Sequence, residues 1–451
     1  MEKIDLLRAH GLFDAKVPRY TSYPPATQFV NGLGIRHQKK WLAMVQRDDE
    51  ISVYIHIPFC KRLCWFCACS TQGTKTLRPV DAYVEVLCKE IETVSEALPK
   101  GIRMGRLHLG GGTPTILSPK TMKRLLNCVF GHFSKSSEFE FSVEIDPTEA
   151  SEELLKTLVD HGLNRASLGV QDFAEDVQQA IGRTQSLEQT VNVISFLRSH
   201  GIPSLNLDLL YGLPKQTEQS FAKTIQEVLS MRPDRLAIYG YAHVPWVSKR
   251  QVLIKETDLP NIEQRLQLAQ KAQTSFVNAG YDAIGIDHFA LPSDGLAKAA
   301  KEGTLRRNFQ GYTDDPSDTL IGFGASSISR FKMGFIQNAP ATSAYQECVK
   351  QTGYAGYKGV QINDLDAVRS RMIMDLMCYF EFRFADLHQD FPQYSDFIEE
   401  MSESLHLKFP NLFNNKSDKM VVEDFAKPLV RIIAAHLDHH TSNSSAHSVA
   451  I

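Results

Sequence analysis

The sequence lacks the features of a membrane-bound or exported protein. No run of 18 apolar residues occurs in the 451-residue chain, so we expect no membrane-spanning helix. The first residues, MEKIDLLRAHGLFDAK, mix both charge signs and contain neither an apolar core nor a small-residue cleavage site. That pattern excludes a signal peptide. We therefore expect a cytoplasmic protein without a membrane span.

An excess of basic residues is also absent. The net charge is −3, whereas a general nucleic-acid surface leaves a basic footprint, so nucleic acid is not an expected partner. No internal repeat is evident, which argues against a repeat protein. With 43% hydrophobic and 22% charged residues, the composition is that of an ordinary globular protein, long enough for two or three domains.

Cysteine is scarce and unevenly placed. Four of the eight cysteines lie within ten residues of one stretch, YIHIPFCKRLCWFCAC. Cys60, Cys64 and Cys67 form a C-x3-C-x2-C arrangement, and Cys69 follows. A disulfide framework is not expected in a long chain without a secretion signal. The other four stand in helical contexts and are assigned to the core: Cys88, Cys128, Cys348 and Cys378.

The spacing of the first three cysteines favours an iron-sulfur cluster. Three thiolates on one loop can hold three irons of a 4Fe-4S cube and leave the fourth iron open to an exogenous ligand. Zinc is an alternative, but structural zinc sites usually pair two knuckles, and no second knuckle follows here. Incidental core cysteines are a third interpretation. We predict that Cys60, Cys64 and Cys67 bind a 4Fe-4S cluster.

Alternating β-rich runs and amphipathic helices from about 50 to 290 indicate parallel βα units. The expected strands are 52–57, 106–110, 140–145, 165–170, 204–210 and 235–241. Six such units predict an α/β fold with a partial (β/α)6 barrel, and a doubly wound open sheet is the alternative. In either fold, ligands bind at the carboxyl ends of the strands.

Several candidate binding residues stand at those strand ends. Gly110–Thr113 (GGGT) lets backbone N–H groups approach a ligand, or else forms only a tight turn. Glu144 is a carboxylate in a run otherwise patterned for burial, where a salt bridge to a neighbouring helix is the simpler explanation. Asp208 lies in an apolar strand, where it could merely form hydrogen bonds with a loop. Gln171 is the last residue of the fourth strand.

The flanks of this region differ in pattern. Residues 1–48 are expected to form an extended arm centred on KVPRYTSYPP, since its prolines disfavour helix. Residues 49–295 form the predicted catalytic domain, and 296–451 a mainly helical C-terminal domain. The stretch 291–320 is rich in Pro, Gly and Asp, which predicts a linker or an active-site lid.

Together these motifs carry a resemblance. HIPFC-x3-CxFCxC, GGGTPT, GVQDF, YGLP, RNFQGYT and PRYTSYP, spread from about residue 16 to about 330, resemble the oxygen-independent coproporphyrinogen III oxidase family of radical S-adenosylmethionine (SAM) enzymes. Two positions depart from the family pattern: Ala68 replaces a glycine and Trp65 a tyrosine. Both positions lie beside the predicted cluster.

The resemblance implies an activity and its cofactors. The family oxidatively decarboxylates coproporphyrinogen III to protoporphyrinogen IX in haem biosynthesis, through a 5'-deoxyadenosyl radical made by reductive cleavage of SAM at the cluster. It implies two SAM molecules per chain. The first would contact Tyr54, Gly111, Glu144 and Ile328. The second would contact Phe66, Gly112, Thr113, Gln171, Arg183, Asp208 and Ala242.

The resemblance implies further roles and partners. Cys69 would be a catalytic residue rather than a cluster ligand, and Lys16 and Arg19 would meet substrate carboxylates. An electron donor such as flavodoxin or ferredoxin is expected, as is a monomer. A haem chaperone related to these enzymes is an alternative, but it lacks the fourth cysteine, so Cys69 favours the enzyme. A paralogue acting on another tetrapyrrole is a further alternative.

Overall fold

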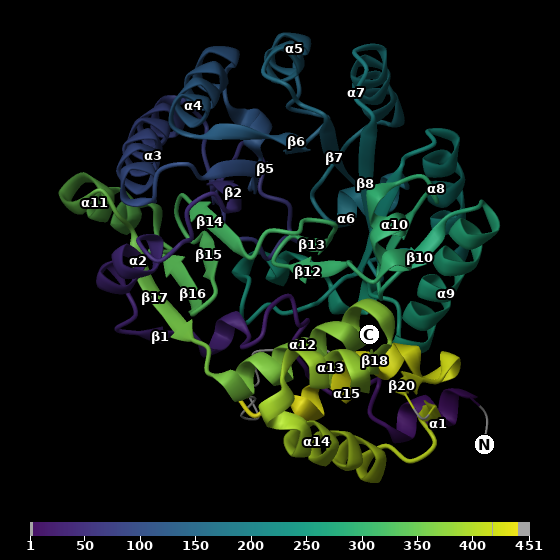
Figure 1. The fold of residues 1–451 in the computed structure, drawn as a ribbon. Helices are drawn as coiled ribbons and strands as arrows, with labels where there is room; N and C mark the ends of the chain where they lie inside the picture. Colours follow the sequence, from purple (N-terminus) through teal and green to yellow (C-terminus); the bar gives the residue numbers. More distant parts are fainter. Residues whose placement is uncertain (1–2, 417, 441–451) are drawn as a thin grey trace.

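The computed structural model describes residues 3–416 and 418–440, and Figure 1 shows the fold. Residues 441–451 of the His- and Ser-rich tail lie outside the described part. In the described part, no helix has both the length and the apolar character needed to cross a bilayer. A sheet of 13 strands forms the centre of the molecule, and helices cover its outer side.

Six neighbouring parallel strands form the partial barrel. They are β2 (Glu50–Ile57), β5 (Arg103–Gly111), β6 (Ser134–Ile145), β7 (Arg165–Gln171), β8 (Ser204–Tyr211) and β9 (Arg235–Gly240). Five of them contain a predicted strand completely, and β9 ends one residue before the end of the predicted strand 235–241, so the predicted fold class is confirmed. The first and last strands of the row do not pair with each other, so the barrel stays open.

Helices follow the strands and form an outer arc (Figure 1). They are α3 (Arg78–Ala97), α4 (Pro119–His132), α5 (Glu152–Asp160), α6 (Glu175–Ala180), α7 (Leu187–Ser199), α8 (Glu218–Ser230) and α9 (Ile262–Asn278). The Ser118 hydroxyl accepts a hydrogen bond from the Thr121 N–H and starts α4, and Ser151 caps α5 in the same way. These caps satisfy N–H groups that a helix leaves unpaired at its start.

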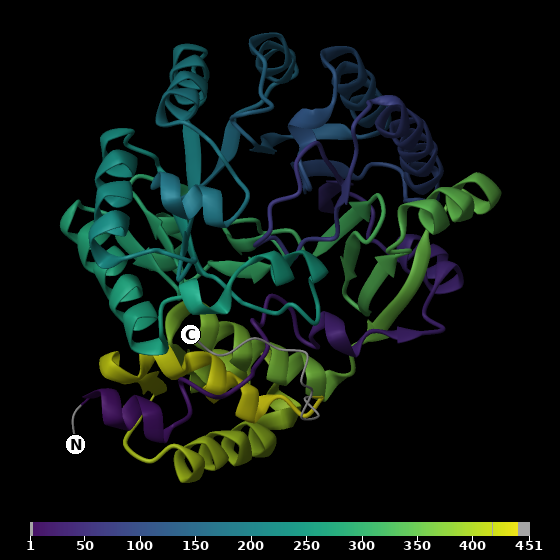
Figure 2. The same ribbon diagram turned by 180° about the vertical axis from the view of Figure 1, so that it is seen from behind.

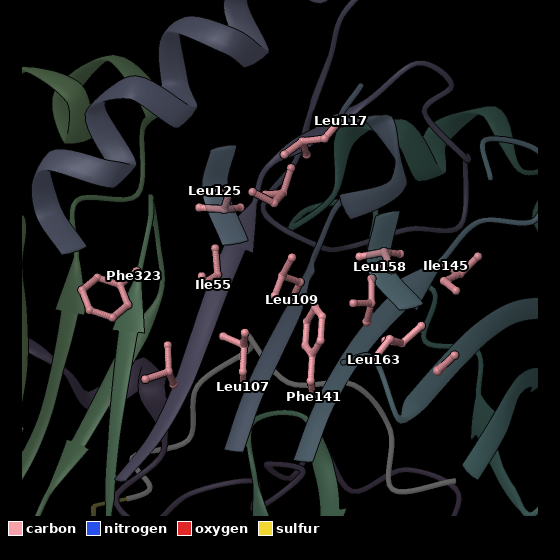
Figure 3. Close-up of a cluster of buried hydrophobic side chains, with 14 of the residues drawn as sticks. Ile55, Leu107, Leu109, Leu117, Leu125, Phe141, Ile145, Leu158, Leu163 and Phe323 are labelled. Atoms are coloured by element: carbon pink, nitrogen blue, oxygen red, sulfur yellow. The ribbon is translucent and has the colours of Figure 1, made fainter. Parts of the chain in front are cut away.

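The main core lies between the strands and this arc of helices. On β5, Leu107 and Leu109 are fully buried and pack with Phe141 of β6. Leu125 of α4 and Leu158 of α5 close this layer from the outside (Figure 3). Since side chains alternate along a strand, the intervening residues must face the inside of the barrel.

The sheet continues beyond the six predicted strands on both sides. On one side lie β14 (Thr319–Phe323), β15 (Ile328–Phe331), β16 (Gly334–Asn338), β17 (Gly356–Gln361) and β1 (Val30–Asn31). On the other lie β11 (His288–Ala290) and β10 (Asp282–Ile284). The expected linker 291–320 contains α10 (Gly295–Glu302) and a ribbon of β12 (Arg306–Asn308) and β13 (Gly311–Thr313). Its polar composition reflects contact with the barrel interior.

A second hydrophobic core joins the two ends of the chain. Leu7, Leu12 and Tyr20 of the N-terminal segment pack with Leu376 and Ile433 near the C-terminus. In both ribbon views α1 (Lys3–Ala9) lies beside the C-terminal segments (Figures 1 and 2). The elements there are α12 (Asp364–Tyr379), α13 (Phe384–Asp390), α14 (Ser395–Lys408), α15 (Val430–Leu437), β18 (Glu381–Arg383), β19 (Phe413–Lys416) and β20 (Lys419–Val422).

The division into domains stays a prediction. Strands within 319–361 belong to the main sheet, whereas residues from Val368 onward contribute to the second core. This packing favours a boundary near Asn363 over the predicted one at 295/296. The remaining short elements are α2 (Ile35–Leu42), α11 (Thr342–Thr352), β3 (Phe59–Cys60) and β4 (Gln72–Gly73).

A buried carboxyl connects α3 to the extended side of the sheet. Glu90 is fully buried and accepts hydrogen bonds from the Gly324 N–H at 2.9 Å, Asn338 Nδ2 at 2.7 Å and the Tyr345 hydroxyl at 2.7 Å. Burial raises the pKa of Glu90 to about 7, although all three donors oppose that rise. Between the ordinary carboxyl pKa and this value, the folded protein keeps a proton that the unfolded chain has lost.

We expect Glu90→Gln to remove a pH dependence of stability. Because the pKa is raised in the folded state, the free energy of unfolding falls as pH rises, by about 2 kcal/mol from pH 5.5 to pH 8. Thermal unfolding at a series of pH values measures this change. As pH rises, the free energy of unfolding of the parent should fall relative to that of the variant. Glu92→Gln, an exposed change on the same helix, is the control. Parallel profiles for parent and Glu90→Gln would contradict the assignment.

Candidate active site

Polar side chains on the inner faces of the six strands surround a cavity of about 650 Å³, here called the barrel cavity. Residues from neighbouring strands that line it include His108, Ser142, Glu144, Ser167, Asn206 and Asp208. Parallel sheets covered on both faces usually carry apolar side chains on both. A polar inner face therefore marks a solvated binding site rather than a packed barrel core.

A network of ion pairs closes the amino-terminal end of this cavity. Glu140 of β6 lies 3.2 Å from Arg165 of β7 and 4.0 Å from Arg106 of β5. Arg235 of β9 is 2.5 Å from Asp294 and 3.2 Å from Asp314, both from the stretch expected to be a linker. Burying a charge is costly unless it is paired, and here each inward charge has a partner on a neighbouring segment.

The cysteine loop follows β2 at the carboxyl edge of the sheet. Cys60, Cys64, Cys67 and Cys69 all line the barrel cavity. Hydrogen bonds attach the loop to the barrel: the Trp65 N–H donates to Ile181 O at 2.9 Å, Gln251 Nε2 to Phe66 O at 2.8 Å, and the Ser248 hydroxyl to Cys67 O at 2.9 Å.

Hydrogen-bond donors surround the three predicted ligand sulfurs. The Thr113 hydroxyl lies 3.5 Å from Cys60 Sγ, Arg183 Nη1 lies 3.7 Å from Cys64 Sγ, and the Cys69 N–H lies 3.4 Å from Cys67 Sγ. Hydrogen bonding from the Cys69 thiol lowers the pKa of Cys67 to about 6 against the effect of burial, and the Cys69 N–H and Arg250 add to it. Donors and cations of this kind favour the thiolate form that binds metal.

The thiols are not gathered around one point as the ligands of a single zinc ion are. A tetrahedral zinc ion with Zn–S bonds of about 2.3 Å holds its sulfurs about 3.8 Å apart. Among the described residues, three ligating atoms come within 4.8 Å of one another only at Asp366, His439 and His440. The three cysteine sulfurs therefore do not form such a group, as a single zinc ion would require.

The GGGT turn is part of the same hydrogen-bonded unit. The Gly112 N–H donates to Ile57 O at 2.8 Å and the Thr113 N–H to Phe59 O at 2.9 Å. The Gly111 N–H donates to Glu144 Oε2 at 3.1 Å, and Gly111 adopts a φ of 118°. These three N–H groups therefore already have acceptors within the protein, and the expectation that the turn binds a ligand stays a prediction.

Glu144 reaches into the cavity from the end of β6. Besides the Gly111 N–H, its partner is His108 Nε2 on the neighbouring strand, at 3.4 Å, rather than a helix residue. The His108 ring stacks on Tyr54 with centroids 5.8 Å apart, and the Tyr54 hydroxyl lies 3.0 Å from His56 Nδ1. Tyr54 is the cross-strand neighbour of His108 and stacks against it, but it is not among the residues that line the cavity.

Gln171, Arg183 and Asp208 all line the cavity, with different surroundings. Gln171 has a φ of 68° where the β7–β8 register shifts, a left-handed backbone uncommon outside glycine. Arg183 donates to Asp146 Oδ2 at 2.9 Å and to Gly169 O at 2.9 Å. Because it also approaches Cys64 Sγ, it joins the cysteine loop to the ends of two strands.

Asp208 is held by its neighbours on the strands. Its carboxylate accepts hydrogen bonds from the Ser167 hydroxyl at 2.9 Å and from Asn206 Nδ2 at 2.7 Å. Burial raises the pKa of Asp208, the two hydrogen bonds oppose this rise, and the charge of Glu144 adds to it.

Of the three remaining predicted contacts, two line the cavity and one does not. Phe66 and Ala242 line the cavity. Ile328 does not; it lies on β15 and packs with Phe29 and Phe335. Of the inward row, the sequence analysis found Glu144 and Asp208 but missed four others: His108, Ser142, Ser167 and Asn206. The available signal was the strict alternation of polar and apolar residues in RLHLG, FSVE and RASLG.

Known proteins share both the cluster motif and the fold. A family model described as "Radical SAM superfamily" matches residues 54–228. The oxygen-independent coproporphyrinogen III oxidase of Cereibacter sphaeroides is 46% identical over 451 residues, covering 100% of both chains. That of Pseudomonas aeruginosa is 41% identical over 86% of this chain and 84% of its own. The solved coproporphyrinogen III oxidase of Escherichia coli, described as a radical SAM enzyme, is 34% identical with a TM-score of 0.89, covering 95% of this chain and 100% of its own.

A partial barrel with three thiols at its carboxyl edge, matched by that family model, defines a radical SAM enzyme. Identity at this level along the full length goes further. The chain belongs to the oxygen-independent coproporphyrinogen III oxidase family, and it is an oxidoreductase.

We expect Cys64→Ala to abolish cluster binding. Anaerobic reconstitution of the parent with iron and sulfide should give about four irons per chain and a broad charge-transfer absorption. The variant should show neither, because a cube held by two thiolates loses a required ligand. Cys128→Ala, which changes a half-buried thiol on α4, should retain the iron. Stoichiometric zinc without iron in the parent would contradict the cluster assignment.

Proposed function

We propose that this protein converts coproporphyrinogen III to protoporphyrinogen IX without oxygen, by oxidative decarboxylation of two propionate side chains. The observation that carries the proposal is the opening of the three-thiol loop onto the polar barrel cavity, in a chain 46% identical along its whole length to oxygen-independent coproporphyrinogen III oxidase. Haem biosynthesis is the process that this reaction serves. An electron donor of the flavodoxin or ferredoxin type remains part of the proposal, as does a monomeric state.

With an iron-sulfur cube held by the three thiolates and with SAM bound, the site would supply a 5'-deoxyadenosyl radical. This radical would remove a β-hydrogen from a propionate. The protein must orient the substrate and exclude side reactions. Cys60, Cys64 and Cys67 would hold the cube, and the donors at Thr113, Arg183 and Cys69 would stabilise their thiolates. Gly111, Gly112 and Thr113 of the GGGT turn line the same cavity, and a backbone carbonyl there would suit an ammonium group.

The cavity also supports binding of SAM by two sets of residues. Tyr54, Gly111, Glu144 and Ile328 would serve the molecule at the cluster. The second SAM molecule would contact seven residues, which all line the cavity: Phe66, Gly112, Thr113, Gln171, Arg183, Asp208 and Ala242. For the first set, support comes from Glu144 and Gly111, which lie side by side at the cavity wall. Tyr54 and Ile328 do not line the cavity. Tyr54 would contribute by stacking on His108, and a contact with Ile328 would require the SAM site to extend beyond the cavity.

Cys69 is placed to transfer a proton or a hydrogen atom. It lines the cavity two residues beyond Cys67, and hydrogen bonding to the Cys67 sulfur raises the pKa of the Cys69 thiol well above its ordinary value. A thiol that stays protonated can donate, whereas a fourth thiolate on the cube would occupy the iron that SAM needs. We therefore propose Cys69 as a catalytic residue and not as a ligand.

We expect the reconstituted parent to form vinyl products from coproporphyrinogen III, SAM and a reductant under anaerobic conditions, detected by mass. Cys69→Ser should keep its iron and still cleave SAM, but product formation should fall about 100-fold or more, as expected when a proton-transfer group is lost. Cys128→Ser is the matched control. Loss of the cluster in Cys69→Ser would show the ligand assignment to be wrong, and normal turnover would make Cys69 a packing residue. No vinyl product from the parent would reject the proposed function.

We expect two SAM molecules to bind per chain. Equilibrium dialysis under anaerobic conditions should give a stoichiometry of two for the parent. Asp208→Asn should lower it toward one, because this carboxylate belongs to the second set. Asp160→Asn, on the outer end of α5, should leave it at two. A firm stoichiometry of one in the parent would contradict the two-molecule proposal.

A further inference from the structure

Two histidines near the C-terminus meet a buried carboxylate outside the barrel cavity. Asp366, in the first turn of α12, is 1% exposed, and His439 and His440 follow α15. Each of the three residues offers one ligating atom, and these atoms lie within 4.8 Å of one another. None of the three lines the barrel cavity. We call them the His–Asp group; within residues 3–416 and 418–440, no other group of this kind occurs.

The spacing of the His–Asp group suits one metal ion. His440 Nε2 lies 2.9 Å from Asp366 Oδ1, and His439 Nδ1 lies 3.7 Å from the same oxygen. A tetrahedral zinc ion with bonds of about 2.1 Å to nitrogen and oxygen holds its ligand atoms about 3.4 Å apart. The two observed separations lie on either side of that value, so small rotations of the side chains would bring the three atoms around one ion.

An ion pair between Asp366 and one protonated ring is the simpler alternative, but it requires only one of the two histidines. The rings of His439 and His440 have centroids 4.0 Å apart, and both approach the same carboxylate oxygen. If both rings were protonated, two like charges would stand side by side against a single carboxylate. Both rings bind a metal ion in their neutral form, so an ion accommodates the two histidines together.

Neighbouring groups orient the side chains of the His–Asp group. Asp366 Oδ2 accepts a hydrogen bond from the Asn363 N–H at 3.3 Å, while Oδ1 is the oxygen that the histidines approach. The Tyr23 hydroxyl lies 3.1 Å from His439 Nδ1. Metal sites in proteins commonly have such supporting contacts around their ligands. Here they hold the carboxylate and one ring in place before an ion binds.

The His–Asp group lies where three distant segments of the chain meet. Tyr23 belongs to the N-terminal segment, Asp366 to α12 and His440 to the residues after α15. Tyr23, Val368 and Leu437 all belong to the second hydrophobic core. The rings of Tyr23 and His440 have centroids 5.7 Å apart. An ion held here would therefore connect the segment after α15 to the start of α12, beside the N-terminal segment.

Two imidazoles and one carboxylate form a ligand set that suits zinc. Imidazole nitrogen is a ligand of zinc and other transition metals, whereas calcium and magnesium prefer oxygen ligands. Zinc sites with three protein ligands have a further position that water can take. We propose that Asp366 Oδ1 and one ring nitrogen each of His439 and His440 bind a zinc ion, which connects the segment after α15 to α12. This site is separate from the three thiols and does not depend on the proposed function.

Zinc binding to the reconstituted protein tests the proposal, because the iron-sulfur cluster then occupies the three cysteines that could also bind zinc. Anaerobic equilibrium dialysis followed by metal analysis should give about one zinc per chain besides about four irons. His440→Gln and Asp366→Asn should each weaken zinc binding about tenfold or more, since even the loss of a contact that supports a ligand has an effect of that size.

A thermal measurement separates a zinc site from an ion pair. Zinc that binds only the folded protein should raise the thermal midpoint of the parent, and more so as its concentration increases. His440→Gln should lose this rise. If His440 and Asp366 formed only an ion pair, the parent would show no dependence on zinc, and the variant would lower the midpoint equally with and without it. That result would overturn the proposal.

His132→Gln, which removes an exposed imidazole at the end of α4, is the matched control and should bind zinc as the parent does. Asp366→Asn keeps a side-chain oxygen for the Asn363 N–H, so the start of α12 should stay folded. Iron content and the midpoint without zinc check the folding of each variant. Zinc affinities within twofold of the parent in both His440→Gln and Asp366→Asn would overturn the proposal, and so would a parent that binds no zinc. The formation of vinyl products is measured separately, so failure of the zinc site leaves the proposed function untouched.

Discussion

The alternation of apolar and polar side chains along six parallel strands is the constraint on which the rest of the structure depends. Outward residues such as Leu107 and Phe141 pack under the helices, and inward residues such as His108 and Ser142 line the cavity. Because the period is two, a slip of one residue in any strand would place charges in the core and leucines in the cavity. Register, core and binding site are therefore specified by the same pattern.

An open barrel with a polar interior needs other segments to cover its missing side. Asp294 and Asp314, from the stretch before β14, pair with Arg235 inside the barrel, and the N-terminal segment lies across the opening. Arg307 and Arg431 hold that segment by its backbone carbonyls. Since the two ends of the chain share one hydrophobic core, the cover depends on contacts between residues more than 400 positions apart in sequence.

Much of this could be predicted from the sequence. The six strands and the clustering of three cysteines on one loop follow from local patterns, which require no knowledge of tertiary contacts. The β-strands after residue 305 were not foreseen, because they are short and because β14 and β17 pair with β2 and β1 near the start of the chain. The contact between Arg431 and the N-terminal segment was not foreseen either, because Arg431 stands in an ordinary amphipathic helix and only folding brings it to Pro18.

The pairing of β2 with β5 also fixes the cluster relative to the cavity. The Gly112 and Thr113 N–H groups donate to carbonyls on either side of Pro58, and the Thr113 hydroxyl approaches Cys60 Sγ. A Cβ atom at Gly112 would lie 2.7 Å from Phe59 O and 3.0 Å from Cys60 Sγ, so only glycine permits this approach. Gly112 therefore has a structural role, because it lets the turn approach the cysteine loop closely. The hydrogen bonds of the turn hold the cysteine loop to the end of the neighbouring strand, and this contact fixes the predicted ligand sulfurs at the edge of the barrel cavity.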